Sequence, residues 1–286
     1  MISDKVSLGK FPQDKFVAGL VQMSSTNDRA ENMAAGEALI REAAARGAQM
    51  ILTPEMTTLI ESDRKALLGK IYEPDDDPSL PVFAALAADL KIWLVIGSMA
   101  VKQGDKIANR CYVLSPDGHI AAQYDKIHMF DVDLPGGEQY RESRSYQAGN
   151  QAAIVQTPWA DMGLSICYDL RFPHLYRKMA QAGAGILTVP AAFTQVTGEA
   201  HWHILLRARA IENGAFVFAS AQTGAHTNAR GDTRNTYGHS LLVDPWGNII
   251  DDGGLDVGVV VAEIDTGLID KARSRVPSLN HDQNIA

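Results

Sequence analysis

Residues 16–56, "FVAGLVQMSSTNDRAENMAAGEALIREAAARGAQMILTPEM", hold the pattern that decides the fold. The apolar run at residues 16–23 predicts a buried strand. Residues 27–47 follow with an Asn/Asp cap signal, helical apolar spacing and a closing glycine, and these features predict a helix. The next apolar run, residues 49–56, predicts a second strand that ends at a proline and an acid. A strand, a helix and a strand in succession are typical of an α/β layered fold.

The same alternation recurs along the chain. A predicted helix at residues 80–91 precedes a predicted strand at 92–101. A second pair follows, with a helix at 174–184 and a strand at 185–190. These units extend the α/β pattern well beyond the first strand.

Two other segments predict neighbouring antiparallel strands, so the sheets should be mixed. Residues 108–125 contain a Pro-Asp-Gly turn between two apolar runs, and residues 238–252 contain a Pro-Trp-Gly turn. Residues 124–150 show no clear periodicity and are rich in polar and charged side chains. A loop of this length is either disordered or functional.

Composition and charge exclude several classes of protein. Of the 286 residues, 46% are hydrophobic and 21% charged, which is typical of an ordinary globular protein. We expect one domain at residues 15–276, a loose N-terminal arm at 1–14 and an extended tail at 277–286. The net charge of −8, without a basic cluster, argues against nucleic acid as a partner.

The sequence also predicts a cytoplasmic protein without a membrane anchor. The first fifteen residues lack the apolar stretch of a secretory signal, and no run is long enough to span a bilayer. Two cysteines in a chain of this length give no disulfide framework, so we expect both thiols to be free.

Three candidate catalytic residues follow predicted strands. Glu55 follows "MILTP", Lys126 follows "HIAAQYD" and Cys167 follows "MGLSI". Taken singly, they read as an exposed acid, a solvated lysine and a cysteine packed as a small hydrophobe. Their shared placement at strand ends, where open α/β sheets bind ligands, favours a common site. Cys111, in contrast, lies inside a strand pattern and is expected in the core.

A cysteine nucleophile needs a base or a positive field, because only a small fraction of an ordinary thiol is ionised near neutral pH. A papain-like partner could come from His128, His174, His201, His203, His226 or His239, but no Cys-protease signature surrounds Cys167. A desolvated Glu55 with Lys126 would serve equally well. A helix predicted to start near residues 171–172 would add its N-terminal dipole.

Several blocks of the sequence, taken together, resemble the nitrilase (carbon–nitrogen hydrolase) superfamily from about Phe16 to Asp265. They occur in the order "ILTPEM" (51–56), "YDKIHMFDVDLP" (124–135), "GLSICYDLRFP" (163–173), "TGEAHWHILLRARAIENGAFVFASAQTG" (197–224) and "YGHSLLVDPWGNII" (237–250). The resemblance implies an α-β-β-α sandwich with mixed sheets, a homodimer or higher homo-oligomer, and a Glu-Lys-Cys triad without metal or organic cofactor.

The resemblance also implies roles for individual residues. Cys167 would be the nucleophile, Glu55 the general base, and Lys126 the group that stabilises the oxyanion together with the Tyr168 N–H. A second acid is expected in "QYRESRSY" (139–146), where Glu142 is our choice. Glu138 is the alternative, and either acid could instead pair with Arg141 or Arg144.

The residues after the nucleophile resemble the amidase branch that contains omega-amidases and the amidases of deaminated glutathione. We expect hydrolysis of a primary amide in a small carboxylated substrate, with deaminated glutathione as the leading type. The alternatives are omega-amidase, N-carbamoyl amino acid hydrolase, nitrilase, or a catalytically silent binding protein on the same fold. His174 and Glu199 depart from this branch, which more often has Glu and Pro at these positions.

Substrate contacts are expected from Tyr168 and from Phe193 and Thr194 in the loop after "VPAA". Arg171 could bind a substrate carboxylate in a bidentate fork or simply pair with Asp169. The "HWH" at 201–203 suggests a metal, but helix residues two apart do not share a face, so no metal site is expected there. Arg207 and Arg209 are expected in structural ion pairs.

Overall fold

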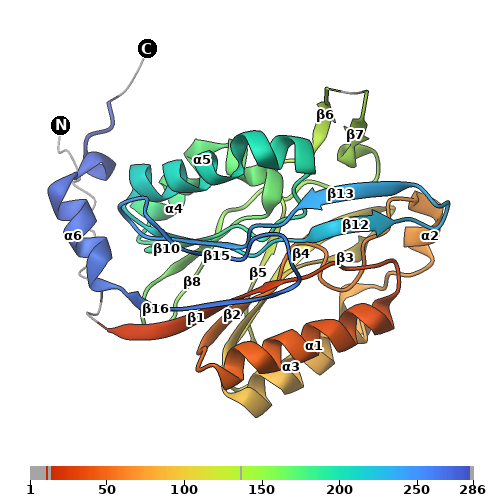
Figure 1. The fold of residues 1–286 in the computed structure, drawn as a ribbon, viewed down its shortest axis with the longest axis horizontal. Helices are drawn as coiled ribbons and strands as arrows, with labels where there is room; N and C mark the ends of the chain where they lie inside the picture. Colours follow the sequence, from red (N-terminus) through yellow and green to blue (C-terminus); the bar gives the residue numbers. More distant parts are fainter. Residues whose placement is uncertain (1–10, 12–13, 136, 284–286) are drawn as a thin grey trace.

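Two six-stranded sheets stack face to face, and helices cover the outer face of each sheet (Figure 1). The computed structural model describes residues 11, 14–135 and 137–283. The first sheet has the order β16-β1-β2-β3-β4-β5, and its strands are β1 (Lys15–Gln22), β2 (Met50–Leu52), β3 (Trp93–Gln103), β4 (Lys106–Leu114), β5 (Ile120–Asp125) and β16 (Gly258–Asp265).

The second sheet has the order β15-β14-β11-β10-β9-β8. Its strands are β8 (Ala153–Val155), β9 (Met162–Leu164), β10 (Ile186–Thr188), β11 (Phe216–Ala219), β14 (Leu241–Val243) and β15 (Ile249–Asp252). Both sheets mix parallel and antiparallel pairs: β1 is parallel to β2 and antiparallel to β16, whereas β10 is parallel to β9 and β11. The predicted α-β-β-α sandwich with mixed sheets is therefore confirmed.

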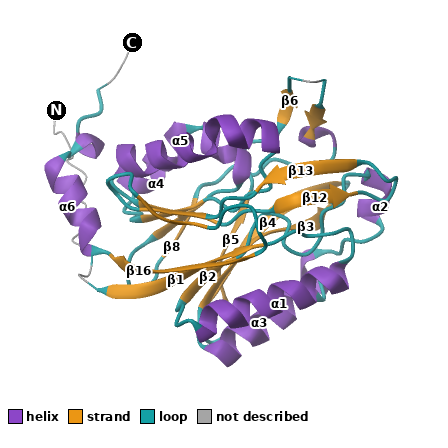
Figure 2. Cartoon of the chain, in the orientation of Figure 1, coloured by secondary structure: helices purple, strands orange, loops and turns teal. Residues whose placement is uncertain are grey.

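Two pairs of helices form the outer layers (Figure 2). The first sheet is covered by α1 (Arg29–Ala45) and α3 (Ser79–Leu90), and the second by α4 (Pro173–Gln181) and α5 (Gln195–Asn213). Shorter elements complete the fold: α2 (Arg64–Leu68), α6 (Gly267–Arg275), the hairpins β6 (Asp131–Asp133) with β7 (Gln139–Arg141) and β12 (Thr223–Thr227) with β13 (Thr233–Tyr237), and 3-10 helices at Pro74–Asp76, Glu142–Arg144, Cys167–Arg171 and Ser278–Asn280.

Local sequence explains the first helix. Asp28 accepts hydrogen bonds from the N–H groups of Ala30 and Glu31, which otherwise lack partners at a helix start. The buried positions Asn32, Gly36, Ile40 and Ala43 lie three or four residues apart, so they share the face that packs on β1. The helix ends before Gly47, whose φ of +93° suits glycine.

Apolar side chains fill three layers. The larger cluster lies between the sheets, for example Leu20 and Val95 from the first sheet and Leu164 from the second, and it continues between the second sheet and α4 and α5, where it includes Trp202. The smaller cluster lies between the first sheet and the helices α1 and α3. Because each sheet is covered on both faces over much of its area, its central strands are almost completely apolar.

Several local predictions differ from the structure. The helix expected near residues 171–172 begins at Pro173, because a 3-10 helix occupies Cys167–Arg171. Residues 124–150 contain the β6–β7 hairpin and a 3-10 helix, and the predicted antiparallel pairs at 108–125 and 238–252 are confirmed. No helix within the described part of the chain is both long and apolar enough to cross a membrane.

Described residues near both ends of the chain contact the rest of the fold. Of the arm at 1–14, residues 1–10 and 12–13 lie outside the described residues, while Phe11 packs beneath the Arg273 guanidinium at 5.1 Å. In the tail expected at 277–286, Ser278–Asn280 form a 3-10 helix, and residues 284–286 lie outside the described residues. Asp282 in this tail forms an ion pair with Arg177 of α4.

Candidate active site

The loops that follow strands of both sheets bring Glu55, Lys126 and Cys167 together. Glu55 and Lys126 follow β2 and β5 of the first sheet, whereas Cys167 follows β9 of the second. The Lys126 Nζ lies 2.9 Å from Glu55 Oε1, and the Cys167 thiol interacts with the same carboxylate. All three side chains are buried, with relative exposures of 4%, 2% and 7%. The structure therefore assembles the three residues that the sequence singled out.

Further hydrogen bonds fix the Glu55 carboxylate. The Ala192 N–H donates to Oε2 at 2.8 Å, and the Asn109 side-chain amide donates to Oε1 at 2.9 Å. Gly97 makes this approach possible, because a Cβ there would lie 2.1 Å from the Thr53 carbonyl oxygen and 2.5 Å from Pro190 Cβ. The two sheets thus come into close contact directly behind the carboxylate.

Glu142 is the second acid of the cluster. Its Oε2 lies 3.0 Å from Lys126 Nζ and accepts a 2.6 Å hydrogen bond from the Phe130 N–H. Glu138 instead accepts a hydrogen bond from the Tyr140 hydroxyl at the exposed edge of the cavity. Arg141 pairs with Asp133 and not with either glutamate. The geometry therefore favours Glu142 over Glu138.

Cys167 has an unusual backbone conformation. Its φ is +49°, which a residue with a Cβ adopts only at some cost in energy and which is common at functional sites. Its N–H donates to the Pro190 carbonyl, whereas the Tyr168 N–H has no acceptor among the described residues. The Tyr168 N–H is therefore available to a ligand at the thiol.

Buried Asp169 holds the turn that carries Cys167. It accepts hydrogen bonds from the Ile166 N–H at 2.9 Å, from the Tyr124 hydroxyl at 2.7 Å and from the N–H and ring of His128. Neither this acid nor a substrate cavity contacts Arg171, whose guanidinium stacks on Phe193 and approaches His201. Arg171 therefore does not pair with Asp169 and does not line the cavity in this structure.

The histidines considered as partners of Cys167 make other contacts. His128 is hydrogen-bonded to Asp169, and His226 to Ser25 and Thr236. The remaining four contact Arg171, Asp252 or aromatic rings: His174, His201, His203 and His239. A carboxylate, and not an imidazole, is thus the base within reach of the thiol.

The electrostatics of the cluster define its resting protonation. Burial alone would raise the pKa of Glu55, but Lys126 and the hydrogen bonds to the carboxylate bring this pKa below its usual value. For Lys126 burial acts to lower the pKa, and the carboxylates of Glu142 and Glu55 outweigh it and raise the pKa well above its usual value.

The pKa of the Cys167 thiol is shifted in the direction opposite to that of an activated cysteine. Burial and then the Glu55 charge raise the pKa of Cys167 well above its usual value, and Lys126 offsets this only in part. A thiolate would add a second net negative charge to a cluster that already holds two carboxylates and one ammonium. At neutral pH the resting state is therefore a neutral thiol beside an ionised carboxylate.

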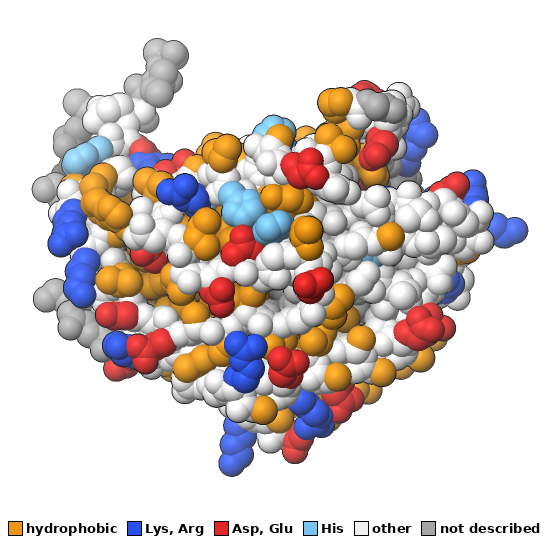
Figure 3. Space-filling model, in the orientation of Figure 1, with side chains coloured by type: hydrophobic (Ala, Val, Ile, Leu, Met, Phe, Trp, Pro, Cys, Tyr) orange, Lys and Arg blue, Asp and Glu red, His pale blue; other side chains and the backbone are white. Residues whose placement is uncertain are grey.

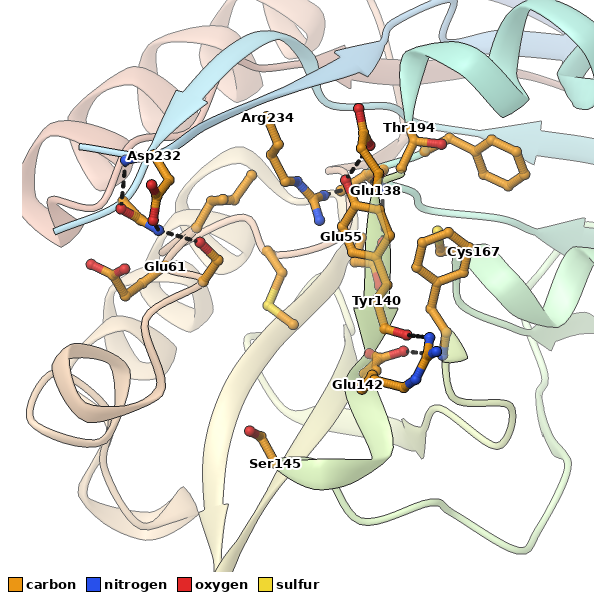
Figure 4. Close-up of a pocket in the computed structure, with 18 of the residues that line it drawn as sticks. Glu55, Glu61, Glu138, Tyr140, Glu142, Ser145, Cys167, Thr194, Asp232 and Arg234 are labelled. Carbon is orange, nitrogen blue, oxygen red and sulfur yellow. Dashed lines mark hydrogen bonds between the residues drawn. The ribbon is translucent and has the colours of Figure 1, made fainter. Parts of the chain in front are cut away.

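A cavity of about 710 Å³ opens onto the cluster (Figure 4). Tyr168, Phe193 and Thr194 line it, as the sequence predicted, whereas Arg171 does not. Nor do the two residues that depart from the amidase branch: His174 packs against His128, and Glu199 accepts a hydrogen bond from Gln195.

Arg234 places a guanidinium in this cavity. It extends from β13 and is one of the residues that line the cavity (Figure 4). Its Nη2 donates to the Ala192 carbonyl at 3.0 Å, and its buried Nε has no partner among the described residues. An arginine that lines a cavity and has N–H groups without a partner is suited to bind an anionic group.

Sequence reasoning missed Asn109 and Arg234. A buried asparagine within the strand pattern "KIANRCYV" was a usable signal, because polar residues are rare in central strands. Arg234 lies in β13, whose sequence "TRNTY" lacks an apolar alternation, and no local signal marks it as a site residue. Its role depends on how the β12–β13 hairpin folds over the cavity.

Comparison with known proteins identifies the family of the chain. The sequence model described as carbon–nitrogen hydrolase matches residues 17–274. The chain is 38% identical over 271 residues to the deaminated glutathione amidase of Yersinia enterocolitica, covering 93% of both chains. It is 39% identical to that of Mus musculus, covering 93% of this chain and 82% of the mouse protein.

A solved structure shows the same fold. The crystal structure of Saccharomyces cerevisiae Nit3, described as a member of branch 10 of the nitrilase superfamily, aligns with a TM-score of 0.82. The alignment covers 95% of this chain and 97% of the yeast chain at 29% identity. The chain belongs to the carbon–nitrogen hydrolase family.

Proposed function

We propose that the protein is a cofactor-independent amidase that hydrolyses the primary amide of a small carboxylated molecule similar to deaminated glutathione. One observation carries the proposal: a single buried carboxylate, Glu55, contacts the Cys167 thiol, the Lys126 ammonium and the Ala192 N–H at the floor of a cavity. The relatives named deaminated glutathione amidase support the choice of substrate.

The first step is attack of sulfur on the amide carbon. Because the resting thiol is neutral, Glu55 takes its proton as the C–S bond forms, so that no free thiolate accumulates. The carbonyl π electrons move onto oxygen, and the Lys126 ammonium and the Tyr168 N–H stabilise the charge that develops there. Negative charge thus passes from the carboxylate to an oxygen beside the ammonium.

Collapse of the tetrahedral intermediate releases ammonia. Glu55 donates its newly acquired proton to the amide nitrogen as the C–N bond breaks, which leaves a thioester on Cys167. A water then attacks the thioester carbon and gives a proton to Glu55. Breakage of the C–S bond and return of that proton to sulfur yield the carboxylic acid and the neutral thiol.

Glu142 acts through Lys126 in this scheme. With the Phe130 N–H on one oxygen and Lys126 beside it, the carboxylate keeps the ammonium charged and oriented. We assign it as a positioning residue. Thr194 and Phe193 shape the cavity wall, and Thr194 Oγ1 is itself hydrogen-bonded to Thr197 at 2.8 Å.

Arg234 takes over the carboxylate-binding role that the sequence had suggested for Arg171. It lines the cavity, and among the described residues its guanidinium donates only to the Ala192 carbonyl, so its other N–H groups could bind a substrate carboxylate. The cavity also offers Arg230, but that side chain already pairs with Asp63.

A substrate panel tests the function. Purified protein is incubated with deaminated glutathione, a 2-oxo-dicarboxylate monoamide, an N-carbamoyl amino acid and a nitrile, while ammonia release and the intact protein mass are followed. We expect the highest kcat/KM with deaminated glutathione and an acyl adduct on Cys167. Faster turnover of the 2-oxo monoamide would make the protein an omega-amidase. Absence of ammonia and adduct with every compound would mean a catalytically silent protein.

Two arginine variants test the carboxylate contact. Arg234→Gln should raise KM by about 10-fold or more with a smaller change in kcat, as expected for a lost charged hydrogen bond. Arg171→Gln is the matched control and should change KM by less than about 3-fold. Equal effects of the two substitutions would contradict the assignment.

The finer predictions on context belong to the same proposal. We place the protein in the cytoplasm as a homodimer, with residues 15–276 as one catalytic domain. Both cysteines are free, as expected in a reducing compartment.

The outer face of α5 is a candidate dimer interface. It exposes Ile204 at 70% and Ile211 at 53%, and a second copy could cover these apolar side chains. Sedimentation of the native protein and of Ile204→Asp tests the dimer, which the substitution should dissociate.

A further inference from the structure

A second cluster of potential ligands lies outside the catalytic cavity. His203 projects from α5, His239 lies between β13 and β14, and Asp252 ends β15. The His203 Nε2 is 3.0 Å from Asp252 Oδ2, and the His239 Nδ1 is 2.9 Å from Asp252 Oδ1. Figure 3 shows histidine side chains beside acidic ones on the surface over α5 and β15. None of the three residues lines the catalytic cavity.

The backbone holds this cluster in place. His239 has a φ of +56°, an unfavourable conformation for a residue with a Cβ. Its N–H donates to the Gly254 carbonyl at 2.7 Å, and its carbonyl accepts from the Trp202 indole at 2.8 Å. The Gly254 N–H in turn donates to Asp252 Oδ1 at 2.9 Å. Strained conformations persist where surrounding contacts determine them, and they often mark functional positions.

We propose that His203, His239 and Asp252 form a binding site for a divalent transition metal, with Zn²⁺ as the favoured ion. Two imidazole nitrogens and one carboxylate oxygen are a common ligand set for zinc, and water would complete a tetrahedral shell. The three side chains are 22% to 31% exposed, so solvent can supply both the ion and the water.

The distances fit a tetrahedral ion after a small adjustment. Metal–ligand bonds of about 2.0–2.1 Å place neighbouring ligand atoms about 3.3 Å apart. In the structure the two contacts to Asp252 are 3.0 Å or shorter, and all three ligand atoms lie within 4.8 Å of one another. Each ring therefore needs to move by less than about 1 Å to bind zinc.

This site differs from the one that the "HWH" motif suggested. His201 is directed to Arg171, 3.2 Å from its Nη2, whereas His203 is directed to Asp252. The two histidines therefore do not act as a pair, as the helical spacing predicted. The other two proposed ligands, His239 and Asp252, lie 36 and 49 residues after His203 in the sequence, so only the fold brings the three together.

Bound metal would connect three segments that are distant in sequence. It would tie α5 to β15 and to the segment before β14, and an ion that binds only the folded state stabilises that state. Since α5 begins next to Thr194, which lines the catalytic cavity, the metal would also fix the helix that borders the substrate.

Metal titrations of the full chain without a histidine tag test the proposal. Cys167→Ala serves as the background, because it removes the thiol that could also bind zinc, and wild type is titrated in parallel. Calorimetry should show one equivalent of Zn²⁺, and Co²⁺ should give visible d–d bands without the charge-transfer band of a thiolate. His239→Ala and Asp252→Ala should each weaken Zn²⁺ binding by about 10-fold or more.

His119→Ala is the matched control, because His119 is an exposed histidine 3.9 Å from Asp117 and lies far from the site in the sequence. It should leave Zn²⁺ affinity unchanged. Circular dichroism of metal-free variants checks folding, and Zn²⁺ should raise the unfolding temperature of the background protein but not of His239→Ala. Undiminished binding in both ligand variants, or no binding at about 0.1 mM Zn²⁺, would overturn the proposal.

Discussion

The two cysteines of the chain are both hidden from solvent, yet their surroundings differ completely. Cys111 lies in β4 with its side chain in the apolar layer between the sheets, and burial alone raises its pKa. Cys167 begins a 3-10 helix at the cavity, with Glu55 and Lys126 beside it. Burial also raises the pKa of Cys167, followed by the charge of Glu55.

The pKa values of both thiols are raised, so the thiol pKa does not distinguish Cys167 from Cys111. Both thiols are protonated at neutral pH. What distinguishes Cys167 is a carboxylate that can receive its proton, an ammonium that can receive the charge, and a cavity that admits a substrate. The predictions below test whether these neighbours, and not the thiols themselves, make the difference.

The largest expected effect is on turnover. Cys167→Ala should lower the rate of ammonia release by about 10⁵-fold or more, because it removes the group that forms the thioester. Cys111→Ala is the matched control and should keep kcat/KM within about 2-fold of wild type, since its side chain does not reach the cavity. Loss of turnover in Cys111→Ala with activity retained in Cys167→Ala would reverse the comparison.

Removal of the ammonium should destabilise the Cys167 region. In Lys126→Met the buried carboxylate of Glu55 and the partly buried carboxylate of Glu142 remain without a cation, which should cost about 3–5 kcal/mol of unfolding free energy at pH 7. Urea unfolding measures this loss. Lys106→Met is the control at an exposed lysine and should change stability by less than about 0.5 kcal/mol.

The same variant should reverse the local pH dependence. In wild type the pKa of Glu55 is lowered, so its contribution to stability is present above the unfolded-state pKa and is lost as pH falls through the folded one. Without Lys126, burial would raise carboxyl pKa values, so the variant should recover stability between pH 7 and pH 5. A stability loss that is the same at both pH values would contradict this account.

Cys111→Ala should have a smaller effect, confined to stability. Replacing a buried thiol with a methyl group leaves a small void between the sheets and should cost about 1–2 kcal/mol of unfolding free energy. Urea unfolding combined with the turnover assay separates the two properties. A stability loss below the error of the measurement would show that this part of the core adjusts easily.

The smallest expected effect is that of pH on kcat/KM. The pKa values of Cys167 and Lys126 are raised and that of Glu55 is lowered, so none of the three titrates between pH 6 and pH 9. Over that range kcat/KM should vary by less than about 3-fold, with the acid limb at lower pH where Glu55 becomes protonated. A sigmoidal rise with a midpoint near 8.5 would instead indicate attack by a preformed thiolate.

Much of the fold was predictable because strand and helix patterns alternate along the chain and are separated by clear capping and turn residues. Asp28 and Gly47 at the ends of α1, and the Pro-Asp-Gly turn between β4 and β5, specify local structure through their own backbone preferences. The 3-10 helix at Cys167–Arg171 escaped prediction, because the tertiary contacts of Asp169 determine it.

The site could be predicted where its residues follow strand ends and match a family pattern, as Glu55, Lys126 and Cys167 do. Arg171 does not line the cavity, because sequence proximity to the nucleophile does not determine the direction of a side chain. Arg234 belongs to a polar hairpin, and only the packing of that hairpin over the cavity brings its guanidinium into the site. Such residues depend on the complete fold.

The close contact at Gly97 makes the activity dependent on the relative position of the two sheets. Glu55 follows a strand of one sheet, while Ala192 and Cys167, which contact it, follow strands of the other. Sliding one sheet by a single residue, about 3.3 Å, would separate these groups while most of the apolar layer stayed buried. Turnover therefore depends on the alignment of the two sheets. A displacement that leaves the helices and the overall shape intact should still abolish it.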